Sequence, residues 1–192
     1  MRTVYTVDEL TGRARERALA KLAEWATHED WREDVYEDAI SLFAHLGIEA
    51  RKLKFSGFWS QGDGASFEGT WKADRVNYAV LAANMPKDSK LLAIGLALQA
   101  FALEFPLAEV IITRSNQCYS HSGTMTIDVY PEGDDSETGS IDDSPAEQLM
   151  RDAADWLYAR LEAEHAYLTD EAQLIENAQA NGYEFEEDGS IA

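Results

Sequence analysis

The sequence has a single cysteine, few prolines and no long hydrophobic run. The lone Cys118 excludes an internal disulfide framework and is typical of a reducing compartment. The most apolar stretch, residues 91–103, is too short to span a bilayer, and the first residues carry no apolar signal segment. These absences predict a cytoplasmic protein that has no association with a membrane.

Basic residues are scarce in the last third of the chain. Residues 128–192 contain 19 acidic and 2 basic residues, whereas residues 1–127 contain 17 acidic and 14 basic residues. Most of the net charge of −20 is therefore concentrated in that third. Because negative charge repels phosphate, this pattern excludes direct binding of nucleic acid and favours a basic protein as partner.

Motifs for catalysis, metals and cofactors are also missing. The four histidines lack metal-ligand spacing, and Cys118 with His121 forms only half of a zinc site. The chain contains no nucleophile elbow, P-loop or dinucleotide fingerprint. We therefore expect no catalytic residue, no metal and no cofactor, and the sequence favours a binding protein over an enzyme.

Hydrophobic periodicity predicts an α+β fold, in which several helices pack a small, mainly antiparallel sheet into a single domain of residues 1–192. Helices are expected at residues 8–25, 30–47, 74–85, 89–105, 144–167 and 169–181, and strands at 48–60, 66–71, 109–114 and 123–130, with short edge strands at 3–7 and 183–185. The helix at 89–105 is apolar nearly all round, which predicts a central, buried helix. An acidic surface loop is expected at 131–143 and an acidic tail at 186–192.

The predicted central hairpin could carry a ligand site. Its turn, residues 61–64, joins two strands rich in aromatic residues, and glycines inside the strands indicate bulges or close backbone approach. The candidate ligand or motif residues are Trp59, Gln61, Asp63 and Glu68. A hydrolase, or a domain that binds a small ligand or a divalent cation through the Ser60–Glu68 turn, is one interpretation. Aromatic side chains that only fill the core are the other.

The segment FSGFWSQGDGASF at residues 55–67 resembles one found in a group of small phage and prophage proteins. Two C-terminal segments, LTDE at 168–171 and YEFEEDG at 183–189, are also similar to theirs. The resemblance covers the hairpin, its flanking helices and the tail. It implies a phage-related protein in the cytoplasm of a host cell, and it implies no particular activity.

This context and the polarised charge together favour a nucleic-acid mimic. Acids four residues apart on a helix are about 6 Å apart along its axis, comparable with the spacing of phosphates, whose axial step is roughly 3.4 Å. We therefore predict a non-enzymatic inhibitor of a basic, nucleic-acid-binding defence complex of the host, of the anti-CRISPR or antirestriction class. The predicted partner-binding residues are Glu29, Glu33, Glu37, Asp134, Asp135, Asp142, Asp143, Asp152, Asp155 and Glu162.

Two other interpretations of the charge and the apolar helices remain open. Acidic residues on exposed helix faces also serve solubility alone. An acidic scaffold that forms a homodimer through its apolar helices is the second alternative.

Overall fold

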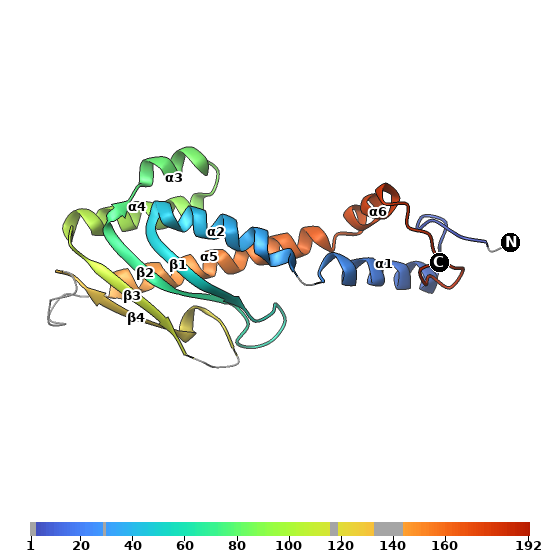
Figure 1. The fold of residues 1–192 in the computed structure, drawn as a ribbon, viewed down its shortest axis with the longest axis horizontal. Coiled ribbons are helices and arrows are strands. Elements are labelled where there is room, and N and C mark those ends of the chain that lie inside the picture. Colours follow the sequence, from blue (N-terminus) through green and yellow to red (C-terminus); the bar gives the residue numbers. More distant parts are fainter. Residues whose placement is uncertain (1–2, 29, 116–118, 133–143) are drawn as a thin grey trace. The chain divides into compact units, whose positions relative to one another are not determined.

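A computed structural model of the protein describes residues 3–28, 30–115, 119–132 and 144–192. The described residues form helices and a four-stranded antiparallel sheet, which confirms the predicted α+β fold (Figure 1). The chain divides into two compact units. We call Met1–Val35 with Leu161–Ala192 the terminal unit, and Tyr36–Arg160 the central unit.

The central unit contains the sheet, whose strand order follows the chain. The strands are β1 (Leu46–Phe55), β2 (Ala65–Val76), β3 (Glu109–Arg114) and β4 (Met125–Tyr130). Ile48 pairs with Trp71, Trp71 with Val110, and Val110 with Val129. All four side chains are buried. Because alternate residues of a strand point to opposite faces, this row defines the covered face of the sheet.

Three helices supply aromatic side chains to that covered face. They are α2 (Glu33–His45), which follows a short 3-10 turn at Asp30–Arg32, α4 (Ser89–Glu104) and α5 (Ser144–Leu168). The ring of Phe43 on α2 lies 5.3 Å from that of Phe67 and 5.7 Å from that of Trp156 on α5. Phe101 on α4 lies 5.8 Å from Trp71. The core is therefore a layer of aromatic rings between the sheet and these helices.

Side-chain caps start several of the helices. Asn77 caps the short helix α3 (Tyr78–Asn84), and Asp88 caps α4 by accepting from the Leu91 backbone N–H at 2.9 Å. The other carboxylate oxygen of Asp88 accepts from the Trp156 indole at 2.8 Å. Helix α6 (Glu171–Ala180) is capped by Asp170 and not by Thr169, because the Asp170 carboxylate reaches two backbone N–H groups.

The terminal unit is built on α1 (Gly12–Ala26) and α6. Its core consists of Val7, Leu10, Ala18, Leu22, Leu174, Ala178 and Phe185. The edge strands predicted at 3–7 and 183–185 are single bridges, in which Phe185 pairs with Tyr5 and with Ile191. Residues 186–192 therefore fold back onto the rest of this unit instead of extending from it.

Three details of the predicted central elements are wrong. β2 continues to Val76, so the helix predicted at 74–85 begins only at Tyr78. β1 begins at Leu46 and ends at Phe55, so Gly47 lies in the strand and Gly57 lies in the loop. Helix α4 is not buried all round, because Leu96 is 57% and Leu103 75% exposed. The helix covers the sheet with one face only, and its outward face keeps apolar residues in contact with solvent.

Candidate functional site

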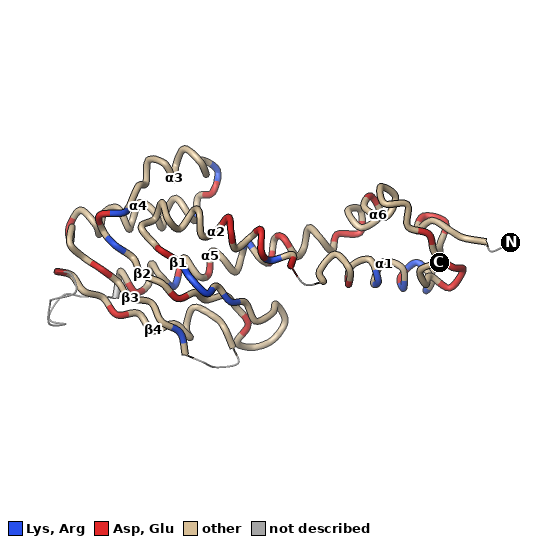
Figure 2. The backbone as a smooth tube through the Cα atoms, in the orientation of Figure 1, with Lys and Arg blue, Asp and Glu red and all other residues tan. Residues whose placement is uncertain are grey.

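The sheet carries charges of both signs, and several of them pair with one another. Glu49 pairs with Arg51 and with Arg75, and Lys72 pairs with Glu109 at 2.5 Å. Hydrogen bonds from Arg51 and then Arg75 hold the pKa of the Glu49 carboxyl below its usual value. Several basic residues of the central unit thus form ion pairs with acids of the same sheet. Figure 2 shows these basic residues as blue segments of β1 and β2.

The acids of helices α2 and α5 differ from those of the sheet. Glu33 and Glu37 on α2, and Asp155 and Glu162 on α5, are exposed. Between described residues, no ion pair involves any of these four carboxylates. We call Glu37 and Asp155, which both belong to the central unit, the acidic helix residues. Figure 2 shows the acids of α2 grouped at the start of that helix.

The remaining predicted partner-binding residues are either less exposed than these four or lie outside the described residues. Asp152 is half-buried, and its carboxylate accepts from Gln148 at 2.8 Å. Five predicted residues lie outside the described residues, namely Glu29, Asp134, Asp135, Asp142 and Asp143. Most of the predicted acidic loop at 131–143 lies outside them as well.

The excess negative charge is divided between the two units. The terminal unit has 17 acids and 6 bases, and the central unit has 19 acids and 10 bases. In the terminal unit all six bases lie in residues 1–35, whereas residues 161–192 have nine acids and no base. Two of these nine acids are neutralised by arginines of α1, because Arg15 pairs with Glu171 and Arg17 with Asp188.

Further exposed acids of the terminal unit also make no ion pair with a described residue, among them Glu176, Glu184 and Glu187. Acid spacing along helices did not indicate them, because Glu184 and Glu187 lie beyond the last helix. The excess of acids in residues 128–192 indicated an acidic surface in this part of the chain, but it did not identify which carboxylates stay unpaired.

The hairpin loop, residues 56–64, is fixed by its own carboxylate. The Asp63 carboxylate accepts from the backbone N–H of Trp59 at 2.9 Å and of Ser60 at 2.6 Å. A Cβ at position 57 would lie 2.9 Å from that same carboxylate, so the close neighbour of Gly57 is a side chain and not the backbone approach predicted for it. Asp63 therefore acts as a turn residue that shapes the loop.

The loop is also attached to the segment that precedes β4. The Ser56 hydroxyl donates to the Ser120 carbonyl at 3.1 Å and accepts from the Ser120 N–H at 3.2 Å. The Tyr119 ring lies against the backbone of Gly62. These contacts hold the loop in place while the side chain of Trp59 is 83% exposed.

Glu68 and Asp63 do not form a carboxylate pair with a shared partner. Glu68 lies on β2 and pairs with Lys52 at 2.6 Å and with Arg114 at 3.7 Å, whereas Asp63 accepts from loop amides. Gln61 is exposed in the same loop. In the described parts of the chain, no three His, Cys, Asp or Glu side chains are grouped as metal ligands would be.

Substitution of Asp63 by alanine should loosen the hairpin loop without unfolding the sheet. The Trp59 and Ser60 amides would lose their acceptor, at a cost of about 1–3 kcal/mol. Hydrogen exchange of these two amides should accelerate. The matched control is Asp74→Ala, since Asp74 is exposed and makes no ion pair with a described residue. Equal exchange in both variants would contradict the role given to Asp63.

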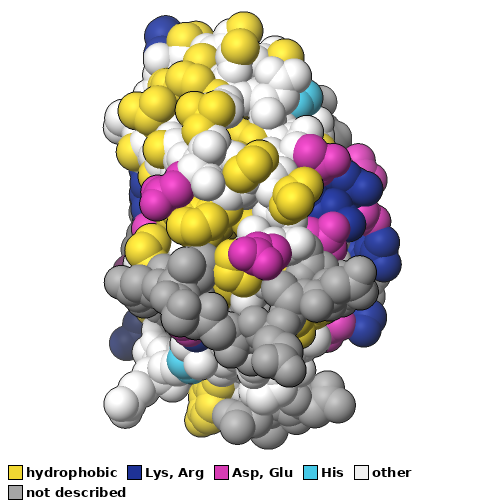
Figure 3. Space-filling model, turned by 90° about the vertical axis from the view of Figure 1, so that its left-hand side faces the viewer, with side chains coloured by type: hydrophobic (Ala, Val, Ile, Leu, Met, Phe, Trp, Pro, Cys, Tyr) yellow, Lys and Arg dark blue, Asp and Glu magenta, His cyan; other side chains and the backbone are white. Residues whose placement is uncertain are grey.

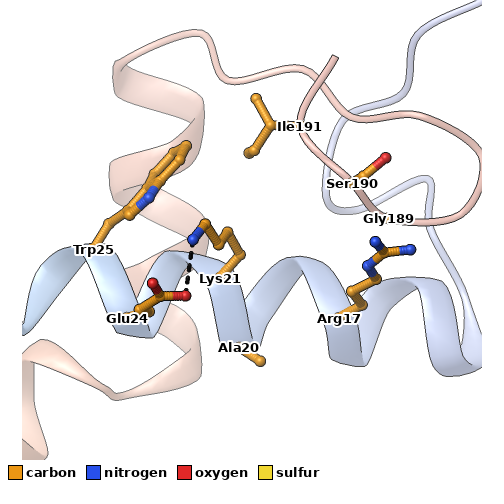
Figure 4. Close-up of a pocket in the computed structure, with 8 residues that line it drawn as sticks. All are labelled: Arg17, Ala20, Lys21, Glu24, Trp25, Gly189, Ser190 and Ile191. Atoms are coloured by element: carbon orange, nitrogen blue, oxygen red, sulfur yellow. Dashed lines mark hydrogen bonds and ion pairs between the residues drawn. The ribbon is translucent and has the colours of Figure 1, made fainter.

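A pocket of about 540 Å³ lies in the terminal unit, between α1 and the C-terminal segment (Figure 4). Its lining includes Arg17, Lys21 and Trp25 from α1, and Ser190. Lys21 pairs with Glu24 at 2.8 Å and lies 5.7 Å from the centre of the Trp25 ring. Because both cations of the lining have an acidic partner, the pocket offers an anion no unpaired charge.

No helix in the described ranges is both long and apolar enough to cross a membrane. Comparison with curated proteins gave no match, and comparison with solved structures gave none either. A protein-family model matches residues 31–171, which is more than half of the chain and includes the whole sheet and the hairpin loop. The chain therefore belongs to the family described as a domain of unknown function, DUF8835.

Proposed function

We propose that this protein is a non-enzymatic inhibitor that binds a basic, nucleic-acid-binding protein through its acidic helix residues. The observation that carries the proposal is that Glu37 and Asp155, on two helices, are exposed and make no ion pair with a described residue. On the sheet, Glu49 and Glu109 pair with neighbouring bases, while Asp74 and Asp128 make no ion pair with a described residue. Unpaired, exposed carboxylates attract a cationic groove and accelerate its association.

The class of target follows from the phage-type hairpin segment together with this charge. A groove that holds nucleic acid presents lysine and arginine at phosphate spacing. The proposed targets are therefore DNA-cleaving defence enzymes of the host, either CRISPR effectors or restriction enzymes. The protein would act in the host cytoplasm and would not itself bind nucleic acid.

The test is DNA cleavage by a panel of purified CRISPR effectors and restriction enzymes in the presence of the protein. At least one enzyme should be inhibited by the wild type. The double variant E37K/D155K should weaken that inhibition by about tenfold or more, because each reversal replaces an attraction by a repulsion.

The matched control is D74K/D128K, which changes the net charge equally at two exposed acids of the central unit outside α2 and α5. It should retain most of the inhibition. Equal loss in both double variants would contradict a role for the acidic helix residues and would leave only an effect of net charge.

One observation favours a second candidate, in which the hairpin loop is the binding site. Trp59 is 83% exposed on a loop that hydrogen bonds hold in one conformation. Rigidly presented tryptophan is a common anchor of binding interfaces. In the same cleavage assay, Trp59→Ala should leave inhibition unchanged if the acidic helix residues make the contact. Loss of inhibition in W59A alone would favour the loop.

A further inference from the structure

The outward face of α4 is an exposed stripe of small and large apolar residues. Leu96 is 57% exposed and Leu103 is 75% exposed. Ala93, which precedes them, and Ala100, which lies between them, are exposed as well. Most single exposed apolar residues need no explanation, but a continuous exposed stripe on one helix marks an interaction surface. Figure 3 is a view onto one end of the central unit, and it shows hydrophobic side chains gathered in the upper part of the surface that faces the viewer.

The spacing of the stripe is that of a helix-pairing seam. Ala93, Leu96, Ala100 and Leu103 follow one another at intervals of three, four and three residues. Alternating intervals of three and four place side chains in one line along a helix and allow it to pack against another helix. The opposite side of α4, with Leu91, Leu98 and Phe101, is already buried in the central unit.

We propose that α4 pairs with α4 of a second copy of this chain, antiparallel and across a two-fold axis. In the register that places Leu96 against Ala100 of the other copy, Leu103 lies against Ala93. Each large side chain then faces a small one, so two identical stripes fit each other. A two-fold interface requires such self-complementarity.

The charges beside the stripe support the same register. Lys90 lies one turn before Ala93, and Glu104 directly follows Leu103. Both are exposed, and neither forms an ion pair with a described residue. In the antiparallel pair, Lys90 of each copy lies beside Glu104 of the other. Opposite charges flanking a seam select the partner and its orientation.

This arrangement also avoids the repulsion expected between two acidic chains. The exposed residues of α4 include one base and one acid, Lys90 and Glu104, so the stripe itself carries no net charge. The acidic helix residues lie on α2 and α5 and do not belong to this stripe. The pairing of α4 does not depend on the function proposed above.

The test is the mass of the full chain by sedimentation equilibrium, over concentrations from about 1 μM to about 1 mM. The wild type should reach twice its chain mass of 21.4 kDa. Leu103→Asp should remain a monomer throughout, because a carboxylate cannot be buried unpaired against Ala93. Ile40→Asp is the matched control, since Ile40 is an exposed apolar residue of α2, and it should dimerise like the wild type.

Charge exchange tests the register itself. Lys90→Glu and Glu104→Lys should each weaken dimerisation by about three- to tenfold, and the double variant K90E/E104K should recover the wild-type constant. Circular dichroism confirms that each variant is folded. A wild type that stays monomeric, an L103D variant that still dimerises, or a double variant that does not recover would overturn the proposal.

Discussion

Replacement of Gly69 by alanine should destabilise the central unit by about 3 kcal/mol or more. Gly69 pairs with Ala50 of β1 and with Ile112 of β3. A Cβ at this position would overlap the carbonyl oxygen of Glu49 and lie 3.1 Å from the Cα of Ala50. Because both neighbours are backbone atoms of a paired strand, they cannot move aside without breaking the β1–β2 ladder.

Urea denaturation measures this loss as a lower transition midpoint. Thr70→Ala is the control, because Thr70 is the next residue of the same strand and points to the open face of the sheet. T70A should change the free energy of unfolding by less than about 1 kcal/mol. If G69A were as stable as T70A, the tight approach of β1 and β2 would be wrong.

Replacement of Gly189 by alanine should release the C-terminal segment from α1. Gly189 is buried at a φ of +81°, and a Cβ there would lie 2.8 Å from the carbonyl carbon of Ala14. Steric overlap and backbone strain act together, at a cost of about 2–4 kcal/mol. Hydrogen exchange should then accelerate at the Glu186 and Gly189 amides, which donate within this segment.

Gly182→Ala separates the two causes. Gly182 also has a positive φ, of +65°, but nothing lies within 4 Å of its Cβ position. G182A should therefore cost only the strain of the left-handed conformation, about 1–2 kcal/mol, and should leave the Glu186 amide protected. Equal exchange at Glu186 in G182A and G189A would show that packing against Ala14 contributes nothing.

Much of the fold followed from the sequence because its signals are local. Glu109–Arg114 forms a strand at the predicted bounds, and α4 and α5 end within one residue of prediction. Gly69 lies at a close backbone approach, as its place in the hairpin indicated. The first strand was misplaced because the turn from α2 into β1 at Gly47 resembles the end of a helix, and only pairing with Val76 shows that the strand has begun.

The candidate site was harder to predict because it depends on contacts between distant residues. The sequence pattern placed the acids on exposed helix faces. It does not show that Glu171 and Asp188 form ion pairs with arginines, whereas Glu37 and Asp155 form none with a described residue. Asp63 was a candidate ligand residue because of its place in a turn rich in glycine and polar residues. In the structure its carboxylate accepts hydrogen bonds from the loop backbone. Helix α4 was expected to be buried because it has apolar residues on nearly all of its faces. The sheet, however, covers only one of these faces.

The central claim is that the acidic helix residues occupy the site where a target protein holds DNA. Competition binding with a fluorescent DNA duplex and an inhibited nuclease tests it directly. The protein should displace the duplex, raising the apparent dissociation constant of the DNA in proportion to its own concentration, and E37K/D155K should lose this effect while D74K/D128K keeps it. A ternary complex of nuclease, DNA and protein, with the affinity for DNA unchanged, would contradict mimicry.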